Sequence, residues 1–253
     1  MPHLNSMIKI TNPHDRFFKE VLSRREAAYD FILNYLPGEI VALLDLKSLE
    51  ISKDTFIDKD LREHFSDILY TVDLTGEGSV CVYLLFEHKS YPEPLIGLHL
   101  LRYMVRIWEQ VIKGGQATPL PPIIPLVIYH GRAKWKVGLE FSDLFHLPGP
   151  LERLVPSFEY LLCDLSCYND GDIKGSVTIK AAFLLLKHIF SDDLGDRLPE
   201  ILGLMKGLLD KQSGLEYWEA FLGYVASGSD QIRNDDIEAA VKEILEDRGG
   251  GIM

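Results

Sequence analysis

The sequence predicts an α/β fold, in which a helix, three strands, a second helix and a further strand form one unit ahead of a helical region. Two observations support this class. Short segments rich in β-branched and aromatic residues lie within the first 131 residues, and the segments between and after them have apolar residues at helical spacing. A third is the order of the elements, because the second helix crosses over between two strands.

The first predicted element is a helix with apolar residues at roughly helical spacing from His14 onward. Asn12 and Pro13 suit a cap and a first turn, and the helix is expected to end near Pro37 and Gly38.

Three strands are predicted next, at residues 46–52, 64–74 and 79–89, because each carries β-branched, aromatic and leucine residues. The glycine-containing segment "TGEGS" between the last two predicts a hairpin.

From Leu95 to Lys113 the apolar residues return to helical spacing, and Gly114 and Gly115 stop the helix. The segment "IIPLVIYHG" predicts the fourth strand, and "FEYLLCDLS" is a candidate for another.

After about residue 172 the sequence predicts helices separated by short polar joints. We therefore expect a first domain over residues 10–170, a helical region over 171–248 and a flexible tail over 249–253.

Composition limits the function. The net charge of -12 argues against a protein that coats nucleic acid nonspecifically, but it permits an enzyme that collects metal ions in an acidic site. Three cysteines match no zinc or disulfide framework and fit a reducing compartment. Neither a signal peptide nor a membrane span is predicted, so a cytoplasmic protein is expected.

Charged residues stand where the third strand leaves the core. Residues i and i+2 of a strand share a face, so Glu87 and Lys89 should lie side by side, roughly 7 Å apart along the strand. Asp67 begins the neighbouring strand, and the hairpin should bring it near Glu87. Two carboxylates with substrate oxygens suffice for magnesium, and a lysine can orient or help deprotonate water and offset charge on phosphorus.

The pattern Asp67 followed by Glu87-His88-Lys89 resembles the PD-(D/E)XK nuclease superfamily. More specifically, from about His14 to Asp164 the chain is similar to the recombination-promoting nuclease or transposase family, which is called YhgA-like. Five segments carry that resemblance: "HDRFFKEVLS", "FSDILYTV", "VYLLFEHKSYPEP", "LLRYMVRIWE", and "PLVIYHG" followed by Trp135.

The resemblance implies a restriction-endonuclease-like core and a magnesium-dependent DNA endonuclease, with Asp67 and Glu87 as metal ligands and Lys89 as the catalytic lysine. Manganese is an alternative cation. Glu20 matches an acidic helix position that assists the metal in relatives. The chain departs from the family pattern at Ser66, where proline is usual, and at Lys89, where many members have glutamine.

Structural roles compete with several of these assignments. Glu87 and Lys89 alone would suit a surface ion pair, and Glu20 a solvated helix residue. Asp164 stands where the family often has an aspartate, but it could cap a turn. The remaining competitors are assigned structural roles and are left out of the site: Asp73 near the hairpin turn, and His88 and His130 at strand ends.

Arg102 and Arg106 on the second helix are candidates for phosphate contact, or form an exposed pair. Two other functions stay open: a noncatalytic DNA-binding or assembly module of transposase origin, and a defence nuclease acting on foreign DNA or RNA. The helical region could pack on the core or on a second copy, and a homodimer would let two sites cut two strands.

Overall fold

The computed structural model describes residues 12–52, 68–76, 81–115, 118–209 and 212–249. They form two compact units, one of them spanning Ala28–Cys167 and the other made of the described residues on either side of it. The first unit holds a sheet, and the second is helical. The amino-terminal helix is grouped with the helical unit, and the predicted domain boundaries stay predictions.

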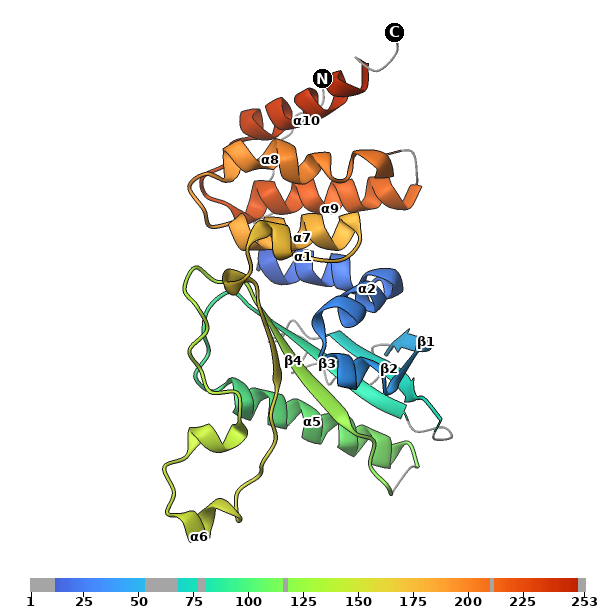
Figure 1. Ribbon diagram of the computed structural model, residues 1–253, viewed down its shortest axis with the longest axis vertical. Helices are drawn as coiled ribbons and strands as arrows, with labels where there is room; N and C mark the ends of the chain where they lie inside the picture. Colours follow the sequence, from blue (N-terminus) through green and yellow to red (C-terminus); the bar gives the residue numbers. More distant parts are fainter. Residues whose placement is uncertain (1–11, 53–67, 77–80, 116–117, 210–211, 250–253) are drawn as a thin grey trace. The chain divides into compact units, whose positions relative to one another are not determined.

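The sheet unit contains a mixed sheet with the strand order β1-β2-β3-β4-β5 (Figure 1). β1 pairs with β2 and β2 with β3 in antiparallel fashion, whereas β3–β4 and β4–β5 are parallel. The α/β class and the predicted strands are confirmed, and the additional candidate strand is β5. The strands are β1 (Leu44–Ile51), β2 (Ile68–Leu74), β3 (Cys81–Lys89), β4 (Ile123–Tyr129) and β5 (Leu161–Asp164).

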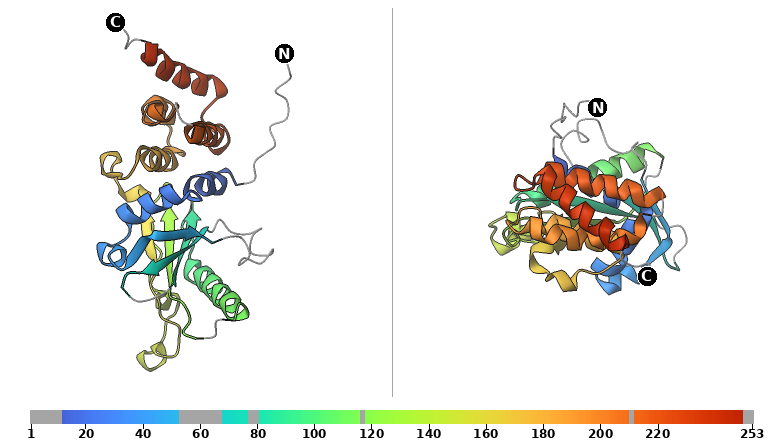
Figure 2. Two further views of the ribbon diagram at one scale, coloured as in Figure 1. Left: turned by 90° about the vertical axis from the view of Figure 1, so that its right-hand side faces the viewer. Right: turned by 90° about the horizontal axis from the view of Figure 1, so that it is seen from above.

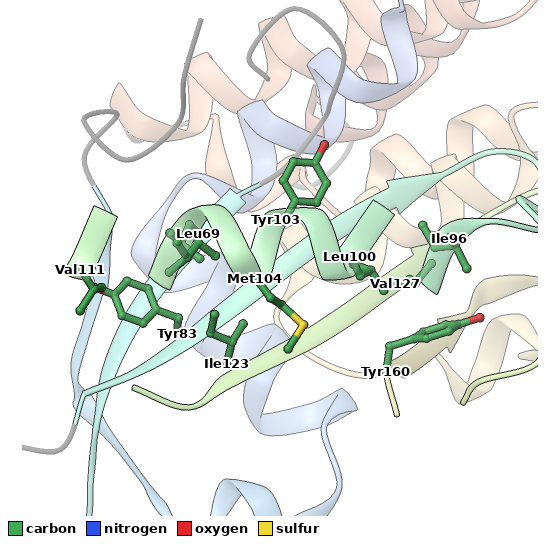
Figure 3. Packing of buried hydrophobic residues seen from close by; sticks show 11 residues of the cluster. Leu69, Tyr83, Ile96, Leu100, Tyr103, Met104, Val111, Ile123, Val127 and Tyr160 are labelled. Atoms are coloured by element: carbon green, nitrogen blue, oxygen red, sulfur yellow. The ribbon is translucent and has the colours of Figure 1, made fainter. Parts of the chain in front are cut away.

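Helix α5 (Ile96–Lys113) is the predicted crossover between β3 and β4, and it lies along one face of the sheet (Figures 1 and 2). Its buried side chains point toward the strands (Figure 3). The shared core comprises Leu69, Tyr83, Ile96, Leu100, Tyr103, Met104, Ile107, Val111, Ile123, Val127 and Tyr160. The amphipathic sequence of α5 thus fixes the helix over the ends of β3 and β4.

Helix α2 (Arg25–Tyr35) contributes Phe31, whose ring meets Phe86 of β3 edge to face at 5.2 Å. β4 is buried at nearly every position, as expected for a parallel strand covered on both faces. The short elements of this unit are α3 (Gly38–Val41), η2 (Phe141–Leu144), α6 (Gly149–Glu152) and η3 (Leu165–Cys167).

In the helical unit, α1 lies against α9 and α8 against α10 (Figure 2). Phe17 of α1 stacks on Tyr224 of α9 with ring centroids 4.2 Å apart. The elements are α1 (Pro13–Leu22), η4 (Asp170–Asp172), α7 (Val177–His188), α8 (Leu194–Gly203), η5 (Lys206–Leu208), α9 (Gln212–Gly228) and α10 (Asn234–Gly249).

The single helix predicted from His14 to about Pro37 is wrong, because the chain turns at Ser23 and Arg24 and forms α1 and α2. The apolar spacing continues through the turn, so the sequence gives no sign of the break. Pro13 begins α1 as predicted, but the side chain of Asn12 makes no capping hydrogen bond.

Candidate active site at the end of strand β3

Glu87 and Lys89 lie at the carboxyl end of β3, opposite Val127 and Tyr129 of β4 in the parallel register. The Lys89 Nζ atom is 2.7 Å from Glu87 Oε1. The side chain of Glu87 is 1% exposed and that of Lys89 is 11% exposed. The predicted side-by-side arrangement is therefore present, but it is a buried ion pair and not a surface pair.

Lys89 has a second carboxylate partner, which the sequence reasoning missed. Its Nζ atom lies 2.9 Å from Glu93 Oε2, and the other oxygen of Glu93 lies 3.2 Å from His99 Nδ1. Glu93 is flanked by Pro92 and Pro94, which restrict the backbone dihedral angles of the loop. The described residues Glu87, Lys89, Glu93 and His99 thus form a continuous polar cluster, called here the strand-end cluster.

Charges in the strand-end cluster alter the protonation of two neighbouring groups. Burial alone would lower the pKa of Lys89, but Glu87 and Glu93 outweigh it and raise that pKa well above its ordinary value. Burial, reinforced by the charge of Glu87, raises the pKa of Tyr103 on α5. Beside these two carboxylates Lys89 is an ammonium ion, and it is suited to orienting and stabilising negative charge.

The structure does not bring the other predicted site residues into the strand-end cluster within the residues that it describes. Asp67 lies outside the described residues, immediately before β2, which begins with Ile68 opposite Phe86. Glu20 lies on α1 in the helical unit, where it pairs with Arg16 at 2.9 Å. Arg102 and Arg106 are both exposed on α5.

Arg106 Nη1 is 2.9 Å from Glu109 Oε2 on the same helix. The proposed roles of Asp67 and Glu20 at a metal, and of Arg102 and Arg106 at phosphate, stay predictions.

Asp164 and the two strand-end histidines have structural surroundings. Asp164 accepts hydrogen bonds from the backbone N–H groups of Trp135 at 3.0 Å and Ser166 at 2.9 Å, as well as from the Ser166 hydroxyl. This arrangement caps the turn that follows β5. His88 and His130 are buried, and their rings stack with centroids 4.7 Å apart.

Within the described residues, no group of three or more histidine, cysteine or acidic side chains is placed to hold a metal ion. Glu87 nevertheless supplies a buried carboxylate at the end of β3, and Glu93 pairs with the other side of Lys89. Magnesium uses oxygen ligands and is commonly bound by one or two protein carboxylates with water and phosphate. The chemistry of the strand-end cluster therefore fits a hard divalent cation.

Residues 12–216 match the family described as "Putative transposase, YhgA-like". The chain belongs to this family. It is 30% identical over 234 residues to the recombination-promoting nuclease RpnA of Escherichia coli K12, covering 92% of this chain and 78% of the relative. It is also 30% identical to the recombination-promoting nuclease RpnD of Escherichia coli O157:H7, with 88% and 84% coverage.

Another relative, from Escherichia coli K12, is named "Inactive recombination-promoting nuclease-like protein RpnE"; it is 32% identical, with 77% of this chain and 64% of the relative covered. No solved structure matches the chain. In the part of the chain that the structure describes, every helix is too short or too polar to cross a membrane.

Proposed function

We propose that the protein is a metal-dependent endonuclease that hydrolyses phosphodiester bonds in DNA. The sheet unit would be a restriction-endonuclease-like core, with Asp67 and Glu87 as ligands of magnesium and Lys89 beside the reacting phosphate. The buried Glu87–Lys89 pair at the end of β3 carries this proposal. It gains support from membership of a family in which relatives are named recombination-promoting nucleases.

The burial of Glu87 beside Lys89 supports a cation site. Two carboxylates, Glu87 and Glu93, face one ammonium, Lys89, with His99 at the far end. Carboxylates that are removed from water need compensating charge or hydrogen bonds, because desolvation penalises the ionised form. A divalent cation at Glu87 would supply such compensation and would release Lys89 for the substrate.

When bound, a divalent cation lowers the pKa of its bound water and withdraws electron density from a phosphodiester oxygen. Lys89 then orients the phosphate and stabilises the negative charge that develops on its oxygens. Hydrolysis forms a bond between phosphorus and the oxygen of water, which gives up a proton to solvent. It breaks the bond to one ester oxygen, which takes up a proton from solvent and leaves as an alcohol.

Glu93 has a positioning role in this scheme. Once a cation occupies Glu87, Lys89 needs another partner to stay close to the reacting phosphate. Glu93 Oε2 is already 2.9 Å from the Nζ atom, and its second oxygen lies 3.2 Å from His99 Nδ1. Glu93 would therefore keep the lysine in place by ion pairing, without itself touching the substrate.

The remaining predicted groups extend the proposal. Glu20 would assist the metal, Arg102 or Arg106 would contact a phosphate, and two copies of the chain would cut two strands. A noncatalytic role in DNA binding or assembly is the second candidate, because the similar protein RpnE is named inactive.

The test is cleavage of supercoiled plasmid by the purified wild type and by Glu87→Gln, in magnesium, manganese or a chelator. We expect nicked and linear DNA only with a divalent metal and only with the wild type. Lack of cutting with either metal, combined with DNA binding that is equal in both proteins, would establish the noncatalytic alternative.

A further inference from the structure

The segment that follows β4 carries a short run of cations in an otherwise acidic protein. Arg132, Lys134 and Lys136 alternate with Ala133 and Trp135, and all three cations are exposed. The net charge of the chain is -12, so three cations within five residues are a local departure from its composition. We call these three residues the cationic ridge.

Neighbouring residues fix the backbone of the cationic ridge from the inner side. The Tyr129 hydroxyl donates a hydrogen bond to the Ala133 carbonyl at 2.5 Å, and the Trp135 N–H donates to Asp164 at 3.0 Å. The Trp135 indole N–H donates to the Tyr160 hydroxyl at 3.2 Å, and that hydroxyl donates to the Gly138 carbonyl at 2.7 Å. Two of these anchors hold Trp135.

Alternation then decides which side chains face the solvent. Trp135, Val137 and Leu139 pack against the core beneath α5. From Lys134 to Glu140, exposed and partly buried residues alternate along the chain. Packing of the odd-numbered side chains against the core accordingly leaves Lys134 and Lys136 exposed on the outer side, and Arg132 is exposed as well.

The cationic ridge begins beside the strand-end cluster. The His130 N–H donates to the Lys89 carbonyl at 3.1 Å, and Arg132 follows two residues later. At Gly131 a Cβ atom would lie 2.6 Å from the Ser90 carbonyl oxygen and 2.2 Å from the Tyr129 hydroxyl oxygen, so only glycine permits this close passage. The backbone from which the ridge extends therefore touches the chain that carries Lys89.

We propose that the cationic ridge binds the phosphate backbone of nucleic acid next to the strand-end cluster. This inference rests on the proposed nuclease function, because that function makes a phosphodiester chain the ligand beside Lys89. Cations on a fixed backbone neutralise phosphates without reading bases, so the ridge would position any sequence. Binding through the cationic ridge also explains how a protein with a net negative charge would hold nucleic acid, because the positive charges that contact phosphate lie together in one segment.

The experiment compares two variants that each lose three positive charges. The ridge variant is Arg132→Gln, Lys134→Gln and Lys136→Gln, and the control is Lys174→Gln, Arg233→Gln and Lys242→Gln in the helical unit. Both change the net charge from -12 to -15, because -12 - 3 = -15. Binding of a fluorescent DNA duplex of mixed sequence is followed by anisotropy without divalent metal, over a series of salt concentrations.

We expect the ridge variant to bind at least about tenfold more weakly than the control and to lose about 2.7 from the slope of log affinity against log salt, since each phosphate contact contributes about 0.9. Equal binding by the two variants would overturn the proposal. Wild-type binding to polyglutamate as tight as to DNA would also overturn it, because the ridge would then serve any polyanion.

Hydrolysis of a small phosphodiester, bis(p-nitrophenyl) phosphate, separates this proposal from the nuclease function. A small diester does not extend along a strand, so the ridge variant should hydrolyse it at the wild-type rate while cutting plasmid poorly. Weakened DNA binding by the ridge variant, together with no hydrolysis of either substrate by the wild type, would support the ridge and reject the nuclease. A wild-type protein that hydrolyses both, with a ridge variant equal to it on both, would reject the ridge and support the nuclease.

Discussion

The strand-end cluster of the sheet unit and an ionic cluster in the helical unit differ in burial and in how acidic and basic side chains are paired. In the helical unit Asp170 contacts Lys187, His188 Nε2 at 2.9 Å and Arg197 at 3.0 Å. Arg197 also pairs with Asp193 at 2.7 Å. In the helical cluster one carboxylate, Asp170, contacts several basic side chains, whereas in the strand-end cluster one lysine, Lys89, contacts two carboxylates.

The two clusters also differ in how far their carboxylates are buried. The Asp170 side chain is 37% exposed, so water already stabilises its charge, whereas Glu87 is 1% exposed. The helical cluster joins η4 to α7 and α8, which is a structural task. The proposed site therefore differs from the helical cluster in its burial at the end of a strand.

The largest expected difference between the clusters is the effect of losing a lysine on the rate of plasmid cleavage. Lys89→Ala should lower the rate of plasmid cleavage by roughly 100- to 1,000-fold, because an electrostatic contact to the transition state is lost. Lys187→Ala removes a lysine that also pairs with an aspartate, and the rate should stay within about twofold of the wild type. Initial rates measured under saturating magnesium test this, and equal losses in the two variants would remove the distinction.

The next effect concerns manganese affinity and the role of Glu93. In Glu93→Gln, Lys89 keeps Glu87 as its carboxylate partner among the described residues and competes more strongly with the cation, so manganese affinity should fall about tenfold. In Lys89→Met the competitor is absent, and adding Glu93→Gln should then change affinity little. Titration calorimetry of all four proteins gives the coupling free energy.

If Glu93→Gln weakens manganese binding by the same factor with and without Lys89, Glu93 acts on the cation directly and the positioning role is wrong. This double-mutant cycle measures manganese binding and requires no cleavage, so it reports on the role of Glu93 in binding separately from catalysis.

A substitution in the helical cluster is expected to have a smaller effect, which changes the free energy of unfolding and leaves metal binding unchanged. Asp170→Asn should lower the free energy of unfolding by about 1 kcal/mol, since the lost pairs are partly exposed. Manganese affinity should be unchanged. Urea denaturation of the variant and the wild type measures the first quantity, and a variant that loses manganese binding while folded would link the two clusters.

The smallest expected effect is the pH dependence of the difference in unfolding free energy between the wild type and Asp170→Asn. Burial would raise the pKa of Asp170, but hydrogen bonds from Lys187 and His188 outweigh it and lower the pKa below its ordinary 3.8. A carboxyl group with a lower pKa in the folded state stabilises the protein above pH 3.8 and loses that contribution as the pH falls through the folded value. The stability difference between wild type and Asp170→Asn should therefore shrink below about pH 4. A difference that grows in acid would contradict the pKa assignment.

The sequence was sufficient for the elements that carry the Glu87–Lys89 pair. Alternation and β-branched residues located the strands, and the two-residue repeat of a strand placed Glu87 beside Lys89. It could not reveal Glu93, because that residue lies beyond the end of the strand and its contact with Lys89 depends on the conformation of the loop before α5. The sequence signal that could have drawn attention to it is an acidic residue between two prolines directly after the strand.

The break between α1 and α2 is a second feature that the sequence did not predict. Phe17 and Phe18 are buried in the helical unit and Phe31 in the sheet unit, yet their spacing fits one continuous helix. Periodicity records that residues are buried, and not which core receives them. The proposed metal roles of Asp67 and Glu20 are likewise beyond what spacing can decide.

The most direct test of the central claim is a manganese titration of the wild type, Glu87→Gln and Asp170→Asn by calorimetry. The account predicts that the wild type and Asp170→Asn bind manganese with the same affinity and that binding by Glu87→Gln is lost. Binding that survives in folded Glu87→Gln, or no binding by the wild type, would contradict the assignment of the strand-end cluster as a metal-dependent active site.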